Sequence, residues 1–175
     1  MAMSLNLKYK KIVGILKKDG IGVVPTDTLY GLVGSAFSKK AINRIYKIKN
    51  RNKKKKMIVL ISSINDLKKF GISNRLICAN ERILEKVWPG KVSVILNEIA
   101  FRLPAKKLLI EILKKTGPLV APSANPEGKK PAKNIKEAKD YFGDSVDFYL
   151  SGGTLKSAPS TLIKIEKDGK IKKLR

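Results

Sequence analysis

The chain has 175 residues, of which 43% are hydrophobic, so it is long enough to bury the core of one globular domain. Its 38 Lys and Arg residues against 14 Asp and Glu residues give a net charge of +24, which favours an anionic partner such as a nucleotide, RNA or a membrane surface. It contains no histidine and one cysteine, Cys78, which excludes Ser-His-Asp and Cys-His nucleophiles, His-ligated zinc, intrachain disulfides and CxxC redox chemistry.

The N-terminal half is predicted to contain helices and buried strands on either side of one polar turn. Apolar residues at helical spacing predict a helix over residues 5–18 that ends at Asp19-Gly20. A short strand over 21–24 and a turn over 25–28 follow. Further on, the pattern predicts a helix over 40–50, a strand buried on both faces over 57–61, and helical segments over 65–70 and 74–88.

The C-terminal half is predicted to contain more strands than helices. Strands are expected over 92–96, 100–103, 119–121, 146–150, 161–166 and 170–174, and helices over 105–115 and 135–142. Helices and strands alternate, but some strands also follow one another, which predicts an α/β fold with a mixed sheet and helices packed on it. We find no repeat and no Gly/Ser- or Pro-rich linker, so residues 1–175 are expected to form a single domain.

Two compositional features bear on location and partners. No apolar run approaches the roughly 20 residues of a membrane span, and residues 1–11 lack the features of a secretory signal, so we expect a cytoplasmic protein. Lys, Ile and Asn are all frequent, a pattern that A/T-biased coding also produces, so the charge alone is weak support for RNA binding. Arginine is rarer and is expected where a planar fork of donors is needed.

Three short segments carry polar side chains at the ends of predicted strands or helices. The turn over residues 25–28, before Gly31, can offer hydroxyl and amide donors to a ligand, or can be an ordinary turn capped by Asp and Thr. Ser123 and Asn125 follow a buried strand, where ligands of α/β sheets tend to bind, although an Asx-type turn explains them equally well.

The third segment is basic. Lys49 and Arg51 end a helix, where they can point at one polyphosphate or simply complement the helix dipole. For Lys53, Lys54 and Lys56 we expect a solvated loop.

Two further residues have environments that need an explanation. The indole of Trp88 is expected to pack in the core and not to stack on a base. Arg102 lies within an otherwise apolar strand, so it needs either a carboxylate partner or an anionic ligand.

Each of these segments is a weak signal, but their order along the chain is specific. In chain order they are Pro-Thr-Asp-Thr-Leu-Tyr-Gly-Leu over residues 25–32, Lys49-x-Arg51, Trp88-Pro89-Gly90, Arg102-x-Pro104, Pro122-Ser-Ala-Asn125 and Ser160-Thr161. From about residue 12 to residue 175, the chain resembles the YrdC family of threonylcarbamoyl-AMP synthases.

The resemblance implies a YrdC-like twisted mixed sheet flanked by helices, with a positively charged concave cavity. It also implies a reaction in which L-threonine, bicarbonate or carbon dioxide, and ATP give threonylcarbamoyl-AMP and pyrophosphate. Mg²⁺ bound mainly through phosphates is expected as a cofactor. The product would feed threonylcarbamoyladenosine formation in tRNA, with tRNA or a tRNA-modifying transferase complex as the downstream partner.

The resemblance further implies roles for individual residues. Lys49 and Arg51 are expected to be catalytic and to hold the ATP phosphates. The expected ATP-binding residues are Lys49, Arg51, Lys55, Ser123, Asn125, Lys130 and Arg175. The expected threonine-binding residues are Thr28, Arg102 and Ser160, with Arg102 pairing with the threonine carboxylate.

The chain departs from the family pattern at several positions. Asn52 and Lys56 stand where prolines are usual, Lys91 replaces a common proline, and Leu60 occupies a position that is often His. Two alternatives remain open. One is a carbamoyl-adenylate-forming domain like that of hydrogenase-maturation carbamoyltransferases, which usually comes with zinc-finger-like cysteines. The other is a non-enzymatic RNA-binding or ribosome-maturation module of the same fold.

Overall fold

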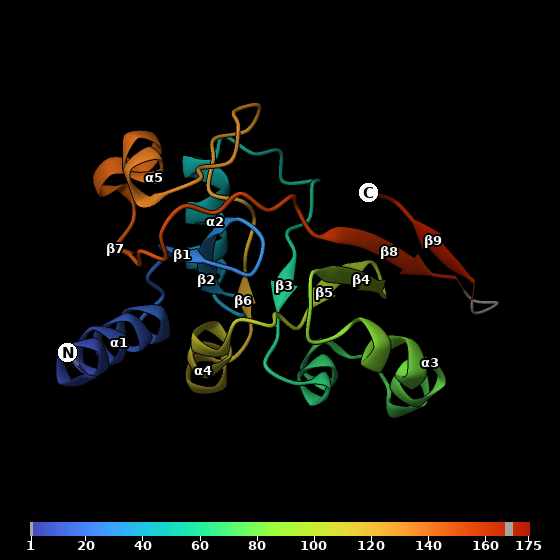
Figure 1. Ribbon diagram of the computed structural model, residues 1–175. Helices are drawn as coiled ribbons and strands as arrows, with labels where there is room; N and C mark the ends of the chain where they lie inside the picture. Colours follow the sequence, from blue (N-terminus) through green and yellow to red (C-terminus); the bar gives the residue numbers. More distant parts are fainter. Residues whose placement is uncertain (1, 167–169) are drawn as a thin grey trace.

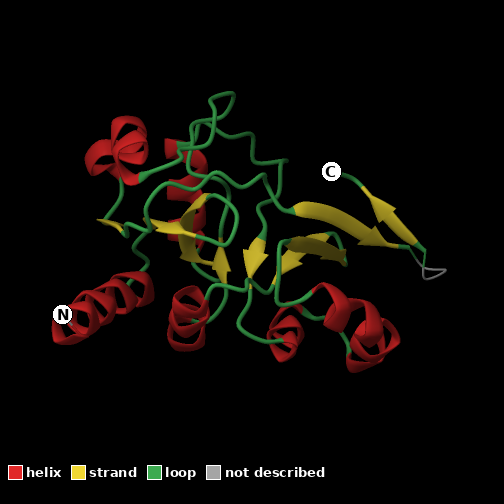
Figure 2. Cartoon of the chain, in the orientation of Figure 1, coloured by secondary structure: helices red, strands yellow, loops and turns green. Residues whose placement is uncertain are grey.

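A nine-stranded mixed sheet organises the computed structural model, which describes residues 2–166 and 170–175. The strands lie in the order β7-β1-β2-β6-β3-β5-β4-β8-β9. Figures 1 and 2 show α1, α4 and α3 along one side of this twisted sheet, while α2 and α5 lie toward the other. The predicted mixed α/β fold is therefore confirmed.

The first strands form an antiparallel hairpin at one end of the sheet. Helix α1 (Ala2–Lys17) leads into β1 (Gly22–Pro25), which pairs with β2 (Tyr30–Ser35) in the register Val24↔Gly31. Strand β2 was not predicted, because two glycines interrupt its apolar pattern. Gly34 has a packing role: a Cβ there would lie 3.1 Å from Cβ of Ala41, so α2 approaches the strand closely.

The centre of the sheet is built from short strands that helices connect. Helix α2 (Lys39–Ile48) begins where the Ser38 hydroxyl accepts from the backbone N–H of Ala41, and ends at Lys49. Strand β3 (Val59–Leu60) runs parallel to β5 (Ile99–Arg102), which pairs Leu60 with Arg102. The elements between them are the 3₁₀ segment η1 (Ile64–Phe70), α3 (Asn74–Val87) and β4 (Val92–Leu96).

Apart from one short 3₁₀ turn that was not predicted, the remaining elements also fall close to the predicted ranges. They are α4 (Lys107–Thr116), β6 (Leu119–Val120), α5 (Ile135–Phe142), the 3₁₀ turn η2 (Gly143–Ser145), β7 (Phe148–Tyr149), β8 (Thr161–Ile165) and β9 (Ile171–Lys173). Residues 150–160 have no regular structure and cross from β7 to β8 over the middle of the sheet (Figure 1).

Two clusters of buried side chains hold these layers together. The smaller cluster lies where α1 and α4 meet the sheet and includes Leu16, Val33, Leu60 and Ile112. The larger cluster includes residues of α2, α3 and α5. As predicted, Trp88 packs in this core: it is 5% exposed and its Nε1 donates to the carbonyl of Val92 at 2.7 Å.

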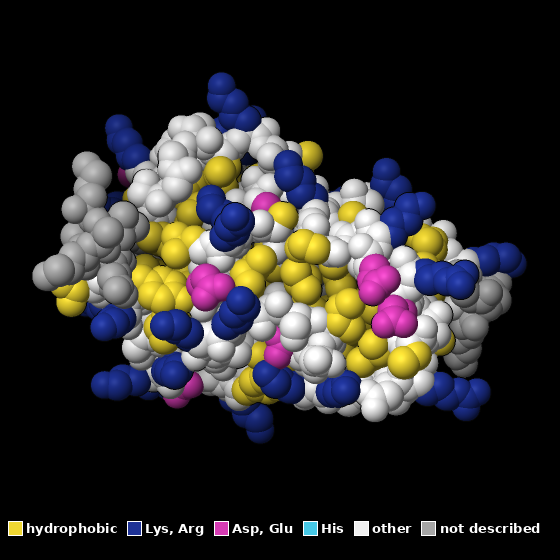
Figure 3. All heavy atoms as spheres, turned by 60° about the horizontal axis from the view of Figure 1, so that its bottom comes forward, with side chains coloured by type: hydrophobic (Ala, Val, Ile, Leu, Met, Phe, Trp, Pro, Cys, Tyr) yellow, Lys and Arg dark blue, Asp and Glu magenta, His cyan; other side chains and the backbone are white. Residues whose placement is uncertain are grey.

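The positive charge is not gathered into one patch on the face of the molecule that Figure 3 shows. On the face that Figure 3 shows, Lys and Arg side chains lie around the whole outline, with hydrophobic and a few acidic side chains between them. Such scattering fits a compositional origin for part of the lysine excess. Within the described part of the chain, no helix is both long and apolar enough to cross a membrane.

Candidate functional site

A cavity of about 460 Å³ opens over the middle of the sheet, in the size range of small-molecule sites. Five segments line it: the turn after β1, the loop between α2 and β3, the end of β5, the loop after β6, and residues 159–162 with Arg175. Its basic lining residues are Arg51, Lys56, Arg102, Lys129 and Arg175, and no Asp or Glu among the described residues joins them. The lining composition favours an anionic ligand.

Arg102 is a buried cation whose Nε atom has no hydrogen-bond partner among the residues that the structure describes. Its side chain stands at the end of β5 and the residue is 4% exposed. Nη1 donates to Oγ1 of Thr28 at 3.0 Å and Nη2 donates to Oδ1 of Asp27 at 3.1 Å, while Nε is buried without a hydrogen-bond partner. Burial lowers the pKa of Arg102, and the Asp27 carboxylate opposes that shift. A buried guanidinium that lines a cavity and is paired with one carboxylate and one hydroxyl is a reason to expect an anionic ligand there.

The turn after β1 holds the guanidinium of Arg102 in place through Asp27 and Thr28. Thr26 Oγ1 donates to the carbonyl of Leu29 at 2.7 Å and accepts from the backbone N–H of Thr28 at 3.1 Å. Asp27 also accepts from the backbone N–H of Ala105 at 3.1 Å, which ties the turn to the segment after β5. The capped-turn interpretation is therefore correct for Thr26, and Thr26 and Thr28 both also line the cavity. Sequence reasoning missed Asp27, whose place beside Arg102 depends on the fold.

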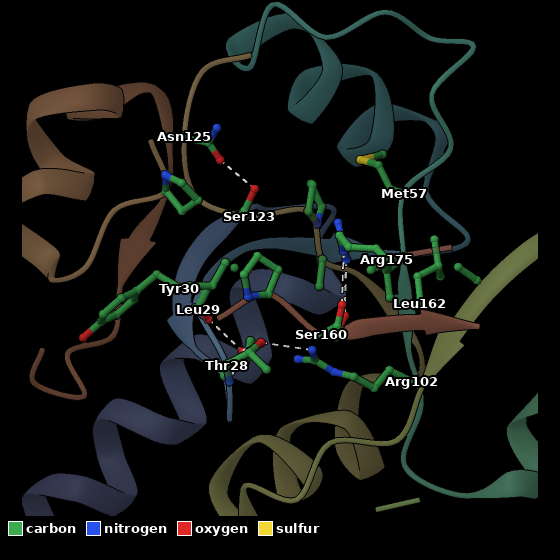
Figure 4. A pocket seen from close by; sticks show the side chains of 18 of the residues that line it. Thr28, Leu29, Tyr30, Met57, Arg102, Ser123, Asn125, Ser160, Leu162 and Arg175 are labelled. Carbon is green, nitrogen blue, oxygen red and sulfur yellow. Dashed lines mark hydrogen bonds between the residues drawn. The ribbon is translucent and has the colours of Figure 1, made fainter. Parts of the chain in front are cut away.

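Ser160 and Arg175 close the same side of the cavity. Ser160 is 3% exposed, and its hydroxyl lies 2.9 Å from that of Ser93. Arg175 donates from Nε to the carbonyl of Ser160 at 3.2 Å and from Nη2 to its hydroxyl at 3.5 Å. In Figure 4, Thr28, Arg102 and Ser160 lie together on one side of the cavity, and Ser123 and Asn125 lie on the other.

Lys49 is not among the residues that line the cavity. It is 2% exposed, and its Nζ donates to the carbonyl of Ser123 at 2.5 Å and to that of Asn125. Burial, and then the nearby Arg51, lowers the pKa of Lys49 to about 8, while Glu127 opposes the shift. In this structure the ammonium holds the loop after β6 in place, and a direct contact with phosphate stays a prediction.

The Ser-x-Asn loop uses much of its polarity internally. Ser123 Oγ donates to Oδ1 of Asn125 at 2.6 Å, and Nδ2 of Asn125 donates to the carbonyls of Pro126 and Lys129 at 2.9 and 2.7 Å. The loop is fixed to β2, because Leu32 N–H donates to the carbonyl of Pro122 at 2.8 Å. Both readings of the loop therefore hold: it is hydrogen-bonded like an Asx turn, and Ser123 and Asn125 line the cavity.

Some of the basic residues expected to bind ATP line the cavity, and others do not. Arg51 lines the cavity and donates to the carbonyl of Lys55 from Nε at 3.1 Å. Lys56, expected in a solvated loop, lines the cavity, and Lys129 lines it where Lys130 was expected. The structure leaves Lys55 and Lys130 outside the lining set. The sequence does not show which lysine side chains of these two loops point into the cavity.

Comparisons with known proteins agree with this fold. Residues 14–175 match the Sua5/YciO/YrdC family model, whose description is "Telomere recombination". A Methanocaldococcus jannaschii protein provisionally named as a threonylcarbamoyl-AMP synthase is 32% identical over 176 residues, covering 91% of this chain and 83% of that protein. The threonylcarbamoyl-AMP synthase of Hahella chejuensis is 29% identical over 158 residues, covering 82% of this chain and 85% of that protein.

A solved structure of P. abyssi Sua5 complexed with L-threonine has the same fold, with a TM-score of 0.85 at 23% identity. The match covers 97% of this chain and 54% of that one, so this chain spans about half the length of its solved relative.

Proposed function

The chain belongs to the Sua5/YciO/YrdC family, and from this membership together with the cavity we propose that it is a threonylcarbamoyl-AMP synthase. It would act as a nucleotidyltransferase, joining the AMP part of ATP to threonine that carries a carbamate. The two curated relatives described above bear that name, one of them provisionally, and one solved relative is complexed with L-threonine.

The observation that carries the proposal is the buried guanidinium of Arg102, which lines the cavity and which Thr28 and Asp27 hold in a fixed orientation. A small carboxylate beside Thr28 and Ser160 would give this cation an anionic partner, and a guanidinium binds a carboxylate in a defined orientation. The carboxylate of L-threonine fits this requirement, and the hydroxyls of Thr28 and Ser160 can meet its polar groups.

The other side of the cavity suits a nucleotide. Arg51 and Lys129 offer positive charge, and Ser123 and Asn125 offer a hydroxyl and an amide. Arg175 lies next to Ser160, so it is placed to contact a ligand that extends from one side to the other. The two sides share one cavity, as a reaction between two bound substrates requires.

The proposed reaction needs charge stabilisation more than proton chemistry. The amine of threonine attacks carbon dioxide, or bicarbonate with loss of water, and loses a proton to give the carbamate. A carbamate oxygen then forms a bond to the α-phosphorus of ATP, and the bond to pyrophosphate breaks. Negative charge grows on the α-phosphate and the leaving group, so Arg51, Lys129 and Arg175 would lower the barrier by stabilising it.

Mg²⁺ would be held mainly by the phosphates of ATP. The described residues contain no cluster of three or more His, Cys, Asp or Glu side chains able to hold a metal ion, and the cavity lining is hydroxyl, amide and cationic. Such a donor set fits a metal that arrives with the nucleotide. The ion would supply further neutralisation of phosphate charge.

The product would be passed on for tRNA modification. We propose a cytoplasmic location and a downstream transferase complex that transfers the threonylcarbamoyl group to adenosine in tRNA. The location and the downstream partner are both inferred from the proposed reaction, and neither is inferred from a docking surface on this chain.

The test is pyrophosphate release from ATP by the purified protein, with and without L-threonine and bicarbonate, with L-serine as the control amino acid. The proposal predicts release that needs threonine and bicarbonate together. Release that is independent of threonine, or none from folded protein that binds ATP, would refute it.

A further inference from the structure

One acidic residue links the two loops that form the nucleotide side of the cavity. The backbone N–H of Glu127 donates to the carbonyl of Lys49 at 2.7 Å. Its Oε2 accepts from the backbone N–H of Asn52 at 3.0 Å, and its Oε1 forms an ion pair with Nζ of Lys55. We name these three contacts the Glu127 clasp.

The clasp lies between residues that the proposed function needs. Arg51 stands between two of its attachment points, Lys49 and Asn52, and Glu127 follows Ser123 and Asn125 in the loop after β6. In Figure 1 the loop after α2 and the loop after β6 both rise above the same part of the sheet. The clasp therefore fixes the position of one nucleotide loop relative to the other.

We propose that Glu127 is a positioning residue for ATP, which holds the Arg51 loop against the Ser123 loop in the arrangement that binds the triphosphate. This inference rests on the proposed function for the identity of the nucleotide. Residues 50–58 contain no helix or strand, and apart from the clasp they are held mainly by hydrogen bonds to Tyr46 and within the segment. Loss of the clasp should therefore loosen the segment around Arg51, and ligand affinity falls by the cost of ordering it again.

A simple electrostatic argument predicts the opposite effect. A carboxylate near a triphosphate repels it, so its removal would strengthen ATP binding. In the structure, however, the charge of Glu127 is met by Lys55 and by the Asn52 amide, which hold the pKa of Glu127 below its ordinary value. The carboxylate is thus ionised and paired at neutral pH, and its positioning effect should exceed its repulsion. The two effects differ in sign, which makes them separable.

The clasp is exposed enough that its loss should leave the fold intact. The side chains of Lys55 and Glu127 are 61% and 27% exposed, and exposed ion pairs add little to global stability. A purely structural role would change the melting temperature and affect both substrates alike. A positioning role predicts an effect on ATP alone.

The experiment measures ATP affinity calorimetrically, and the KM values for ATP and threonine by pyrophosphate release, for Glu127→Ala and Glu127→Gln. Glu127→Ala should weaken ATP binding about 5- to 30-fold, as expected for loss of a charged hydrogen bond and an exposed ion pair. Glu127→Gln should lose less, because its amide oxygen can still accept from Asn52. The KM for threonine should change less than twofold. In a Lys55→Met background, Glu127→Gln should have a smaller effect.

Glu111→Ala is the matched control, since Glu111 forms an exposed ion pair with Lys114 on α4 at 3.0 Å. ATP affinity in Glu127→Ala that equals or exceeds that of the wild type would overturn the inference, as would equal losses for ATP and threonine. If the wild type binds ATP but does not release pyrophosphate with threonine, the proposed function fails while the affinity measurement still tests the clasp. A wild type that does not bind ATP overturns both.

Discussion

Nη2 of Arg102 lies 3.1 Å from Oδ1 of Asp27, and both side chains are more than nine-tenths buried. The pair joins the end of β5 to the turn after β1, across 75 positions in sequence. Asp27 and Thr28 each accept from one of the five N–H groups of the guanidinium, so other N–H groups remain for a ligand. The pair thus orients the guanidinium of Arg102, which lines the cavity.

Replacing Arg102 with lysine tests this arrangement without removing the positive charge. Lysine can still pair with Asp27, but it cannot present a planar fork to a carboxylate. Arg102→Lys should raise the KM for threonine roughly 10- to 150-fold, the equivalent of about 1.5–3 kcal/mol for a charged hydrogen bond, with ATP affinity within about twofold. The exposed Arg82→Lys in α3 is the matched control. An unchanged KM for threonine would place the carboxylate elsewhere.

Arg51→Ala tests the nucleotide side. Arg51 lines the cavity, and its contacts within the protein are carbonyls of its own loop, so the fold should survive its loss. Loss of a charge-assisted phosphate contact should cost about 1.5–3 kcal/mol, or roughly 10- to 150-fold in turnover. Steady-state kinetics beside Arg75→Ala, an exposed arginine of α3, measure this effect. Near-normal turnover would show that Arg51 does not hold the phosphates.

Lys49 should make stability depend on pH in a defined direction. Its pKa is lowered by burial to about 8 in the folded protein, below the ordinary lysine value of 10.5. Below pH 8 the ammonium is protonated in both states. Between about pH 8 and 10.5 the unfolded state binds more protons, so the contribution of Lys49 to stability rises with pH.

Denaturant unfolding of the wild type and of Lys49→Met at pH 7.5 and pH 10 measures this contribution. The difference in unfolding free energy between the two proteins should shift in favour of the wild type at the higher pH. Lys47→Met, an exposed lysine on the same helix, is the matched control. A difference that stays constant would mean that Lys49 is less buried than its contacts indicate.

Two glycines should respond with opposite sign to the same substitution. A Cβ on Gly34 would lie 3.0 Å from Cγ2 of Ile21 and 3.1 Å from Cβ of Ala41, so Gly34→Ala should destabilise by about 1–3 kcal/mol through overpacking. A Cβ on Gly14, inside α1, would meet no atom within 4 Å, so Gly14→Ala should stabilise by up to about 1 kcal/mol. Thermal melts of both variants test this. Equal shifts would contradict the close packing of β2 on α2.

The fold was largely predictable from the sequence, because most elements carry a clear periodicity. The exception, β2, contains Gly31 and Gly34, whose small size suits close packing but gives no apolar alternation. The order of the motifs predicted the arginines and hydroxyl residues of the cavity but not its lysines, because Lys56 and Lys129 line it in place of Lys49, Lys55 and Lys130. The individual contacts of these residues were not predictable, because they depend on neighbours far along the chain. Lys49 is buried by a loop 74 positions away, and Glu127 is one half-buried loop residue without a local signal.

The most direct test of the central claim follows the carbon of bicarbonate. The protein is incubated with ¹³C-labelled bicarbonate, L-threonine and ATP, and the nucleotides are separated and analysed by mass spectrometry. We predict that the label appears in an adenylate that also contains threonine, with pyrophosphate formed in equal amount. Release of ADP and phosphate, or an adenylate without the label, would show that this cavity catalyses a different reaction.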